Sequence, residues 1–285
     1  MVFNFKNLKD LIVPEYLIIT FFTTFAIFLI IENSFDSIYG LILIILSISF
    51  VSLGLNAFNQ IYDLSGDKIS KPNRPIVSNK ISIKEAKFVS WSLYFFAILI
   101  SFFVNLIFSG IIILSVLFAI AYSHPFIRLK KIPFSGIIFG VFFYSIIPFL
   151  SIWTLSFNYF PLHFFCFFIM LTFISSSLKD YEDIHADKKE KLINLFTIFG
   201  KKAYLLILNS WFIIIFCMFL FSWLFLDFKF FITGLISILF SGIFLILMKG
   251  KVVEKIIITQ SRLLTYLMLS SIFIELLYGI TAFYS

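Results

Sequence analysis

Long apolar runs separated by short polar segments dominate the hydropathy pattern of this chain. A helix needs about twenty apolar residues to cross the hydrocarbon core of a bilayer, and a backbone facing lipid must satisfy its own hydrogen bonds as a helix. The pattern therefore predicts an all-α membrane protein, a single domain over residues 1–285 with nine transmembrane helices. We place them at 14–32, 38–60, 88–108, 110–127, 133–154, 160–179, 204–226, 230–248 and 263–284.

Two shorter features refine this outline. Residues 3–12 (FNFKNLKDLI) have the pattern of an amphipathic helix lying at the membrane surface. The third and fourth apolar runs are joined only by Ser109 and Gly110, which predicts a tight hairpin there. The first run is long and lacks a small-residue cleavage site, so we expect a retained span and not a signal peptide.

Composition and charge agree with a membrane location. Of 285 residues, 61% are hydrophobic and 13% charged, which is more apolar surface than a soluble domain can bury. Cys166 and Cys217 lie singly inside apolar runs, so small core residues are favoured over metal ligands or a disulfide.

The basic residues indicate an orientation. With a cytoplasmic N-terminus and nine crossings, every Lys and Arg except Lys229 falls on the cytoplasmic side. The chain is thus expected in the cytoplasmic membrane with its C-terminus outside. The basic residues behind the net charge of +7 would then lie at the cytoplasmic surface, where they can face anionic headgroups or an anionic substrate. A nucleic-acid partner is not needed to explain this charge.

A polar stripe ends the second apolar run. Its members fall at helical spacing over the last two turns, and a further carboxylate extends it if the helix continues. A polar stripe facing lipid is costly, so it should face the bundle interior or a wet cavity. The stripe comprises Asn56, Asn59, Gln60, Asp63 and Asp67.

The sixth run carries a second stripe of the same kind. Both runs are even-numbered, so both stripes should end at the cytoplasmic surface, and both contain D-x-x-x-D-K, which hints at an internal repeat. The second stripe comprises Thr172, Ser176, Lys179, Asp180, Asp183 and Asp187.

Two aspartates four residues apart repel each other, and a second such pair nearby increases the repulsion. Carboxylates without a His or Cys set favour a hard cation such as Mg²⁺, which is often completed by substrate phosphates. Solvated helix ends would explain one such pair, but less readily two on the same face. The cations beside the motifs exceed what a metal site needs and suit a diphosphate; they are Lys68, Lys71, Arg74, Lys188 and Lys189.

At these residues the chain resembles the UbiA superfamily of intramembrane prenyltransferases. That family carries N-(D/Q)-x-x-D-x-x-x-D and K-P-x-R-P after helix 2, and D-x-x-D-x-x-x-D after helix 6. The resemblance covers essentially the whole chain. The matching residues are Asn59, Gln60, Asp63, Asp67, Lys71, Pro72, Arg74 and Pro75, then Asp180, Asp183 and Asp187.

The resemblance implies a central cavity, open laterally to lipid, in which Mg²⁺ and a prenyl diphosphate bind. It implies metal ligands at Asn59, Asp63, Asp67, Asp183 and Asp187. The four aspartates and Tyr122 are the implied catalytic residues. Substrate binding is assigned to Asn59, Lys68, Lys71, Arg74, Arg128, Lys130, Asp180 and Lys188.

Several positions depart from the family pattern. Ala186, Lys191, Asn194 and Phe196 stand at its Gly, Gly, Thr and Pro places, and Val13-Pro14-Glu15 replaces a common Arg-Pro pair. Asn79 stands at another glycine place, where Asn tolerates a left-handed turn better than most residues.

The implied reaction is Mg²⁺-dependent transfer of a polyprenyl group, for example from geranylgeranyl diphosphate. The acceptor stays open between an aromatic ring such as 4-hydroxybenzoate or homogentisate and geranylgeranylglyceryl phosphate. A cation transporter is the main alternative, but its acids should lie near the midplane. A CDP-alcohol phosphotransferase would need a D-G-x-x-A-R element, which is absent. The roles of His124, His185 and the intramembrane Glu275 are open, and His163 is expected to be structural.

Overall fold

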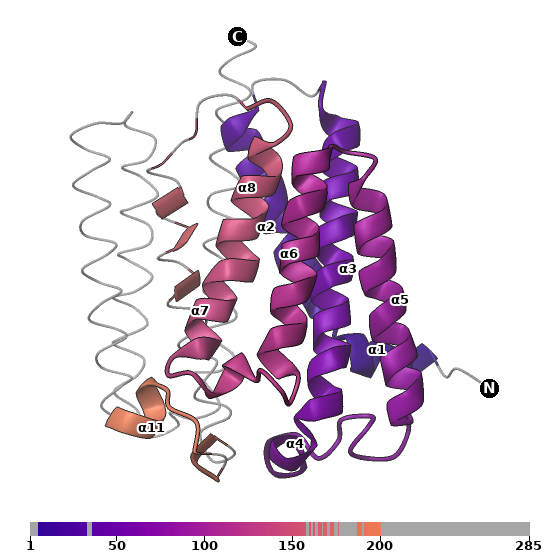
Figure 1. The fold of residues 1–285 in the computed structure, drawn as a ribbon, viewed down its shortest axis with the longest axis vertical. Helices are drawn as coiled ribbons and strands as arrows, with labels where there is room; N and C mark the ends of the chain where they lie inside the picture. The colour runs from indigo at the N-terminus through magenta and orange to yellow at the C-terminus, as the bar shows by residue number, and fades with distance from the viewer. Residues whose placement is uncertain are drawn as a thin grey trace, which may run out of the picture.

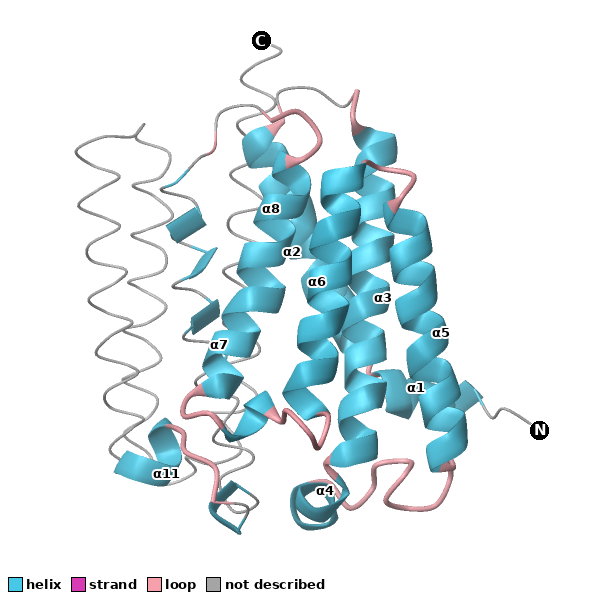
Figure 2. Ribbon diagram, in the orientation of Figure 1, coloured by secondary structure: helices cyan, strands magenta, loops and turns pink. Residues whose placement is uncertain are grey.

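The computed structural model describes residues 5–32, 36–157, 160, 162, 165–166, 168–169, 172–173, 176, 187–189 and 191–200. Within this part of the chain the regular elements are helices and no strand occurs (Figure 2). The expected spans 204–226, 230–248 and 263–284 lie outside the described residues, as do Cys217, His163, His185 and Glu275.

The described elements follow the chain as an antiparallel bundle with short connections (Figure 1). They are α1 (Phe5–Ile12), α2 (Glu15–Ile31), α3 (Ile38–Tyr62), α4 (Leu64–Ser70), α5 (Ile83–Ser101), α6 (Leu106–Ser123), the 3₁₀ turn η1 (Leu129–Lys131), α7 (Ser135–Val141), the π-helical η2 (Phe142–Ile146), α8 (Ile147–Trp153) and α11 (Leu195–Phe199).

Three of the described helical stretches are long and apolar enough to cross a membrane: α3, α6 and the continuous stretch Ser135–Trp153. The pair α1–α2, bent by 52°, would make a fourth if it is one broken span. The predicted helices at 3–12, 14–32 and 38–60 are confirmed within a few residues. The count of nine spans and the orientation stay predictions.

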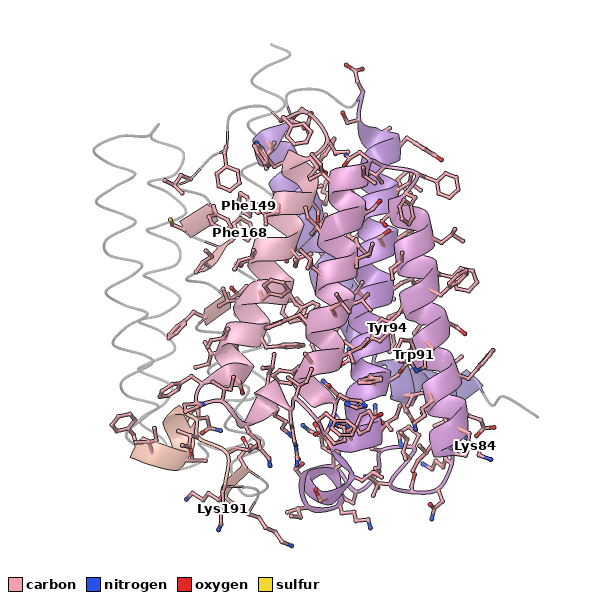
Figure 3. All side chains as sticks on the ribbon, viewed as in Figure 1. Lys84, Trp91, Tyr94, Phe149, Phe168 and Lys191 are labelled. Atoms are coloured by element: carbon pink, nitrogen blue, oxygen red, sulfur yellow. The ribbon has the colours of Figure 1, made fainter. Side chains whose placement is uncertain are left out.

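Helix α3 is the centre of the described bundle. It packs against α1, α2, α5, α6 and α8. Its approach to α5 depends on small residues: a Cβ added at Gly54 would lie 2.7 Å from Cε1 of the buried Tyr94 (labelled in Figure 3). The Ser90 hydroxyl also donates to the Gly54 carbonyl at 3.2 Å. In a bilayer the hydrophobic effect does not drive helices together. Small residues that let two helix backbones approach closely are one way in which such helices associate.

The predicted hairpin at Ser109 and Gly110 was wrong. The chain turns at residues 102–105, and both residues lie inside α6. The physical reason is Asn105, whose side chain caps α6 by accepting from the Phe108 N–H at 2.8 Å and also donates to the Thr154 carbonyl at 2.9 Å. The Ser109 hydroxyl donates a hydrogen bond to the Asn105 carbonyl at 3.0 Å, which is compatible with its position inside the helix.

The predicted span at 133–154 is one helical stretch with a π-helical centre. Pro148 lacks an N–H and its ring crowds the carbonyl four residues earlier. The chain accommodates this upstream, where the Ile147 N–H reaches the Phe142 carbonyl five residues back. The neighbouring Ser145 hydroxyl is hydrogen-bonded to the Thr172 hydroxyl at 2.8 Å. Thr172, a member of the second polar stripe, therefore faces the bundle, as predicted.

One end of the bundle gathers the polar connections. α4, η1 and α11 lie at this end in Figure 1. In Figure 3 the labelled Lys84 and Lys191 and many nitrogen-tipped side chains are found there. The candidate site is built from these connections.

Candidate functional site

The first aspartate motif lies where α3 meets α4. α3 ends at Tyr62, and Asp63 (φ −98°, ψ 18°) leaves the helical conformation before α4 begins at Leu64. In Figure 1 α4 is seen end-on whereas α3 runs along the picture, so the chain turns sharply at this point. The polar stripe therefore does not continue straight to Asp67, as an unbroken helix would require. The break turns the second carboxylate across the end of the bundle.

Asp67 is buried and paired with a cation. Its Oδ2 lies 2.5 Å from Arg74 Nη1, and its side chain is only 6% exposed. Burial raises the pKa of the Asp67 carboxyl above its usual value; the Arg74 guanidinium opposes the rise and the neighbouring Asp63 charge adds to it. A carboxylate in this condition is stabilised by any further cation that reaches it.

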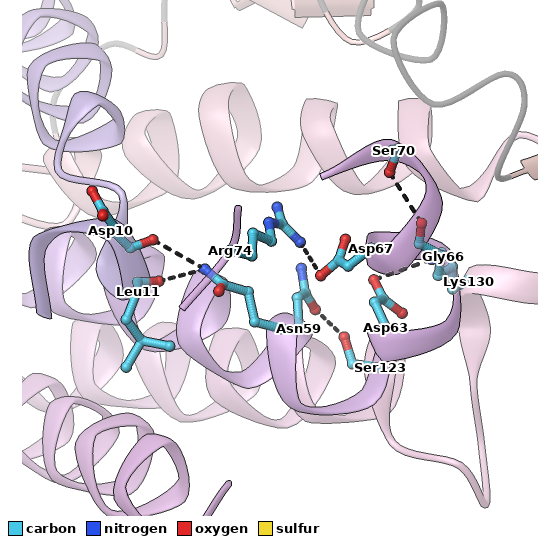
Figure 4. Close-up of polar contacts among 11 residues, drawn as sticks. Asp10, Leu11, Asn59, Asp63, Gly66, Asp67, Ser70, Arg74, Ser123 and Lys130 are labelled. Carbon is cyan, nitrogen blue, oxygen red and sulfur yellow. Dashed lines mark hydrogen bonds and ion pairs between the residues drawn. The ribbon is translucent and has the colours of Figure 1, made fainter. Parts of the chain in front are cut away.

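Asp63 has a cationic partner from a different connection. Its Oδ2 lies 3.1 Å from Lys130 Nζ, with side-chain exposures of 15% and 17%. Lys130 belongs to η1, between α6 and α7. Figure 4 shows Asp63, Asp67, Arg74 and Lys130 in one cluster, in which Asp63 pairs with Lys130 and Asp67 with Arg74.

Asn59 stands one turn before Asp63 in α3. Its side-chain oxygen accepts a hydrogen bond from the Ser123 hydroxyl at the end of α6 (Figure 4). The amide is thereby fixed with its oxygen towards α6. Ser123 is a site residue that the sequence analysis missed. Its position directly after Tyr122 was the signal available.

The connection that carries Lys130 is strained. Arg128 and Phe134 on either side of η1 have left-handed backbone conformations, φ 43° and 60°, which cost about 1–2 kcal/mol each for residues with a Cβ. Such strain collects where a fold must aim a functional side chain. Here it brings Lys130 to Asp63.

Tyr122 and His124 stand on either side of Ser123 at the end of α6. The Tyr122 ring stacks on Phe139, with centroids 3.9 Å apart. The His124 ring contacts Tyr62, the residue before Asp63, with centroids 5.5 Å apart. The His124 ring therefore packs next to the first motif, and the Tyr122 ring packs on α7. The catalytic role implied for Tyr122 stays a prediction.

Gln60, the second letter of the first motif, has a different partner from its neighbours. Its side-chain amide donates to the carbonyls of Leu11 at 2.8 Å and Asp10 at 3.3 Å. These are C-terminal carbonyls of α1, which lack partners within their own helix. Gln60 therefore ties α1 to the segment that holds Asn59.

The other predicted substrate-binding residues differ in exposure. Lys68 and Lys188 are exposed; Lys71 and Arg128 are half-buried, and the backbone N–H of Lys71 donates to the Asp67 carbonyl at 2.8 Å. Asp180 and Asp183 lie outside the described residues, as does Lys179.

Asp187 is the described aspartate of the second motif. Its Oδ2 accepts a hydrogen bond from Asn194 Nδ2 at 2.7 Å. The adjoining turn is joined to the connection of Lys130, because the Phe134 N–H donates to the Ile193 carbonyl at 2.9 Å. The flanks of the two motifs are thus linked at one end of the bundle. Asn194 is a second residue whose role the sequence analysis missed, although N-x-x-T is a helix-capping signal.

The donor atoms suit a hard divalent cation. Within the described residues no group of three or more His, Cys, Asp or Glu side chains gathers as a metal cluster. The available donors are the side-chain oxygens of Asn59, Asp63, Asp67 and Asp187, and oxygen ligands are what Mg²⁺ prefers. Lys130 and Arg74 on the first two carboxylates show that positive charge is already accommodated there. These residues fit Mg²⁺.

Curated proteins similar to this chain are named as synthases or prenyltransferases. Digeranylgeranylglyceryl phosphate synthase of Methanococcus aeolicus is 35% identical over 176 residues, 61% of this chain and 62% of that protein. The chloroplastic 2-acyl-4-prenylphloroglucinol 6-prenyltransferase of Humulus lupulus is 29% identical over 195 residues, 63% of this chain and 46% of that protein. The aligned part spans about six-tenths of the length of the digeranylgeranylglyceryl phosphate synthases.

The fold has a solved counterpart. A UbiA homologue from Archaeoglobus fulgidus, solved with GPP and Mg²⁺, superimposes with a TM-score of 0.71 at 18% identity, covering 95% of this chain and 99% of that one. At this identity the likeness concerns the fold. The family model of UbiA prenyltransferases matches residues 20–278, nearly the full chain. This chain therefore belongs to the UbiA prenyltransferase family.

Proposed function

We propose that this chain transfers a polyprenyl group from a prenyl diphosphate to a lipid-pathway acceptor in an Mg²⁺-dependent reaction. The observation that carries the proposal is a pair of ion pairs at the C-terminal end of α3. Asp63 Oδ2 lies 3.1 Å from Lys130 Nζ, and Asp67 Oδ2 lies 2.5 Å from Arg74 Nη1. Carboxylates that bind a metal, with cations beside them, are the combination that an Mg²⁺–diphosphate complex requires. Family membership supports the reaction class.

The site residues have different proposed roles. Asn59, Asp63, Asp67 and Asp187, together with Asp183, would hold Mg²⁺, which when bound stabilises charge on the departing diphosphate. Arg74 and Lys130 can exchange their carboxylate partners for diphosphate oxygens as the substrate arrives. The C–O bond to the prenyl carbon breaks with its electron pair going to diphosphate, the acceptor attacks that carbon, and the acceptor loses a proton.

The proposed acceptor is a glycerol phosphate ether such as geranylgeranylglyceryl phosphate. Support comes from the similarity to the digeranylgeranylglyceryl phosphate synthase of Methanococcus aeolicus. The similarity to the Humulus lupulus prenyltransferase favours an aromatic ring as the second candidate. In both cases the nucleophile needs a dry approach to the prenyl carbon, since water would capture the cation.

The wider architecture belongs to the same proposal. We propose a single domain of nine spans with the N-terminus in the cytoplasm, the C-terminus outside and the site at the cytoplasmic face. The distribution of Lys and Arg supports this orientation, and the placing of α4, η1 and α11 at one end of the bundle agrees with it.

The test is release of diphosphate by the purified, lipid-reconstituted protein. Geranylgeranyl diphosphate would be supplied with Mg²⁺ and, in separate reactions, geranylgeranylglyceryl phosphate, 4-hydroxybenzoate, homogentisate and a dihydroxynaphthoate. We expect release and product with the glycerol phosphate ether, and loss of both with EDTA. Product with an aromatic acceptor instead would identify an aromatic ring, the second candidate, as the acceptor.

A binding measurement separates the remaining outcomes. Tight Mg²⁺-dependent binding without turnover would mean an acceptor or chain length outside the panel. No binding of any prenyl diphosphate would reject the proposal and favour the cation transporter, which a flux assay in proteoliposomes would then examine.

A further inference from the structure

Asn194 connects the second aspartate motif to the helix that follows it. It is 5% exposed and stands at the N-cap of α11. Its Oδ1 accepts from the Thr197 N–H at 2.8 Å, while its Nδ2 donates to Asp187 Oδ2 at 2.7 Å. One amide therefore both caps the helix and contacts the carboxylate.

The turn between these residues holds the amide in place. The Leu192 N–H donates to the Asp187 carbonyl at 2.9 Å, which folds the chain back upon itself. Lys191, within this turn, has φ 55°, a left-handed conformation that reverses the chain direction. Leu192 and Phe196 are buried on either side of Asn194. The position of Asn194 is thus set by packing as well as by hydrogen bonds.

The orientation of the amide is also fixed. Rotating it by 180° would turn its oxygen towards the Asp187 carboxylate and its NH₂ towards the Thr197 N–H, so both hydrogen bonds would become repulsive. The NH₂ group is therefore a permanent donor to Oδ2. A carboxylate held by such a donor keeps one rotamer, and its metal affinity depends on partners of this kind.

We propose that Asn194 is a positioning residue that orients Asp187 for cation binding. The inference rests on the proposed function, because it takes Asp187 as part of the Mg²⁺–diphosphate site. It also gives a physical role to a position at which this chain departs from the Thr of the family pattern. The longer amide reaches the carboxylate while its oxygen serves as the cap.

Asn194→Ser is the main test. Serine is a good N-cap but is too short to reach Asp187. The readout is binding of geranylgeranyl thiodiphosphate, an unreactive analogue, by the reconstituted full chain as Mg²⁺ is titrated. We expect the Mg²⁺ concentration for half-maximal binding to rise about 10- to 100-fold, with kcat at saturating Mg²⁺ changed much less.

Thr197→Val is the matched control. It removes the bond from the Asn194 N–H to Thr197 Oγ1 at 2.8 Å, on the same cap, and leaves the Asn194 amide intact. We expect its Mg²⁺ dependence to stay within about twofold of the original. Asn194→Gly, which costs a cap only a few tenths of a kcal/mol, provides a second variant should Asn194→Ser fold poorly.

Asp187→Asn distinguishes a failure of the inference about Asn194 from a failure of the proposed function. If Asp187→Asn impairs Mg²⁺-dependent binding and both Asn194 variants bind like the original, Asn194 is only a cap and the inference is wrong while the function stands. Equal shifts in Asn194→Ser and Thr197→Val would also assign the effect to the cap. If the unaltered protein shows no Mg²⁺-dependent binding, the proposed function and the inference fall together.

Discussion

The two aspartate motifs contain the same letters, D-x-x-x-D-K, but their described carboxylates have different partners. In the first motif Asp63 and Asp67 face Lys130 and Arg74, two cations from separate connections. In the second, Asp187 faces the neutral amide of Asn194, from the turn directly after it. The first motif therefore includes charges that can transfer to an anionic ligand, whereas the contact at Asp187 supplies orientation. In the proposed site both motifs hold Mg²⁺, and Arg74 and Lys130 beside the first motif also bind the diphosphate.

The largest expected effect is loss of the carboxylate charge itself. Asp63→Asn or Asp187→Asn should reduce turnover by about 10²- to 10³-fold or more, because each removes charge from the metal site. Diphosphate release under saturating Mg²⁺ is the measurement, with thermal unfolding as the control for folding. Full activity at the original Mg²⁺ dependence in either variant would remove that motif from the site.

Neutralising a cation should have the next largest effect. Arg74→Gln and Lys130→Gln should each weaken prenyl diphosphate binding about 10- to 100-fold, because a charge-assisted contact to phosphate is lost. Lys130→Arg keeps the charge and should retain most of the affinity. Lys189→Gln changes an exposed cation beside the second motif and should have little effect; an equal loss there would assign the effect to overall positive charge and not to the contacts of Arg74 and Lys130.

A smaller effect is expected where the first motif has its own orienting contact. Ser123→Ala removes the hydroxyl that donates to Asn59 and should raise the Mg²⁺ requirement about tenfold, by the reasoning applied to Asn194. Ser115→Ala in the same helix is the matched control, since that hydroxyl bonds only its own helix at the Ile111 carbonyl, 2.7 Å away. Indistinguishable Mg²⁺ titrations for the two variants would show that Asn59 needs no such support.

The smallest expected effect concerns the turns beside the motifs. Asn79 and Lys191 both have left-handed conformations, φ 57° and 55°, and both stand at glycine places of the family pattern. Lysine lacks the tolerance of asparagine for this region, so Lys191→Gly should raise the Tm by about 1–3 °C and Asn79→Gly by less. A lower Tm for Lys191→Gly would mean that the lysine side chain stabilises the turn more than its backbone strain costs.

The sequence predicted those features that depend on hydropathy and local pattern. The helices at 3–12, 14–32 and 38–60 followed from apolar spacing, and the left-handed conformation of Asn79 agrees with its place at a glycine of the family pattern. The hairpin between α5 and α6 was misplaced because the turn at residues 102–105 is almost as apolar as the helices beside it, so hydropathy does not mark it. The end of α5 and start of α6 are set by the Asn105 cap, whose second bond, to Thr154, joins residues 49 positions apart.

The composition of the site was predicted better than its contacts. Spacing alone placed Asn59 and Asp63 on one stripe, whereas Asp67 reaches the site through the break between α3 and α4. The pairing of Asp63 with Lys130 spans 67 positions and depends on two strained residues, Arg128 and Phe134, that no pattern marks. The contacts of Ser123 and Asn194 were missed for a related reason. Both are ordinary capping or hydroxyl residues whose importance comes from what the fold places opposite them.

The bond between Gln60 and the end of α1 has a practical consequence for protein preparation. Removing the first dozen residues would delete more than α1, because the Gln60 amide, which is 1% exposed, would lose both carbonyls to which it donates. An unsatisfied buried amide costs about 1–3 kcal/mol, and this one is adjacent to Asn59. A shortened chain would thus be damaged at the active-site end of α3, far from the cut in sequence, so affinity tags should leave α1 in place.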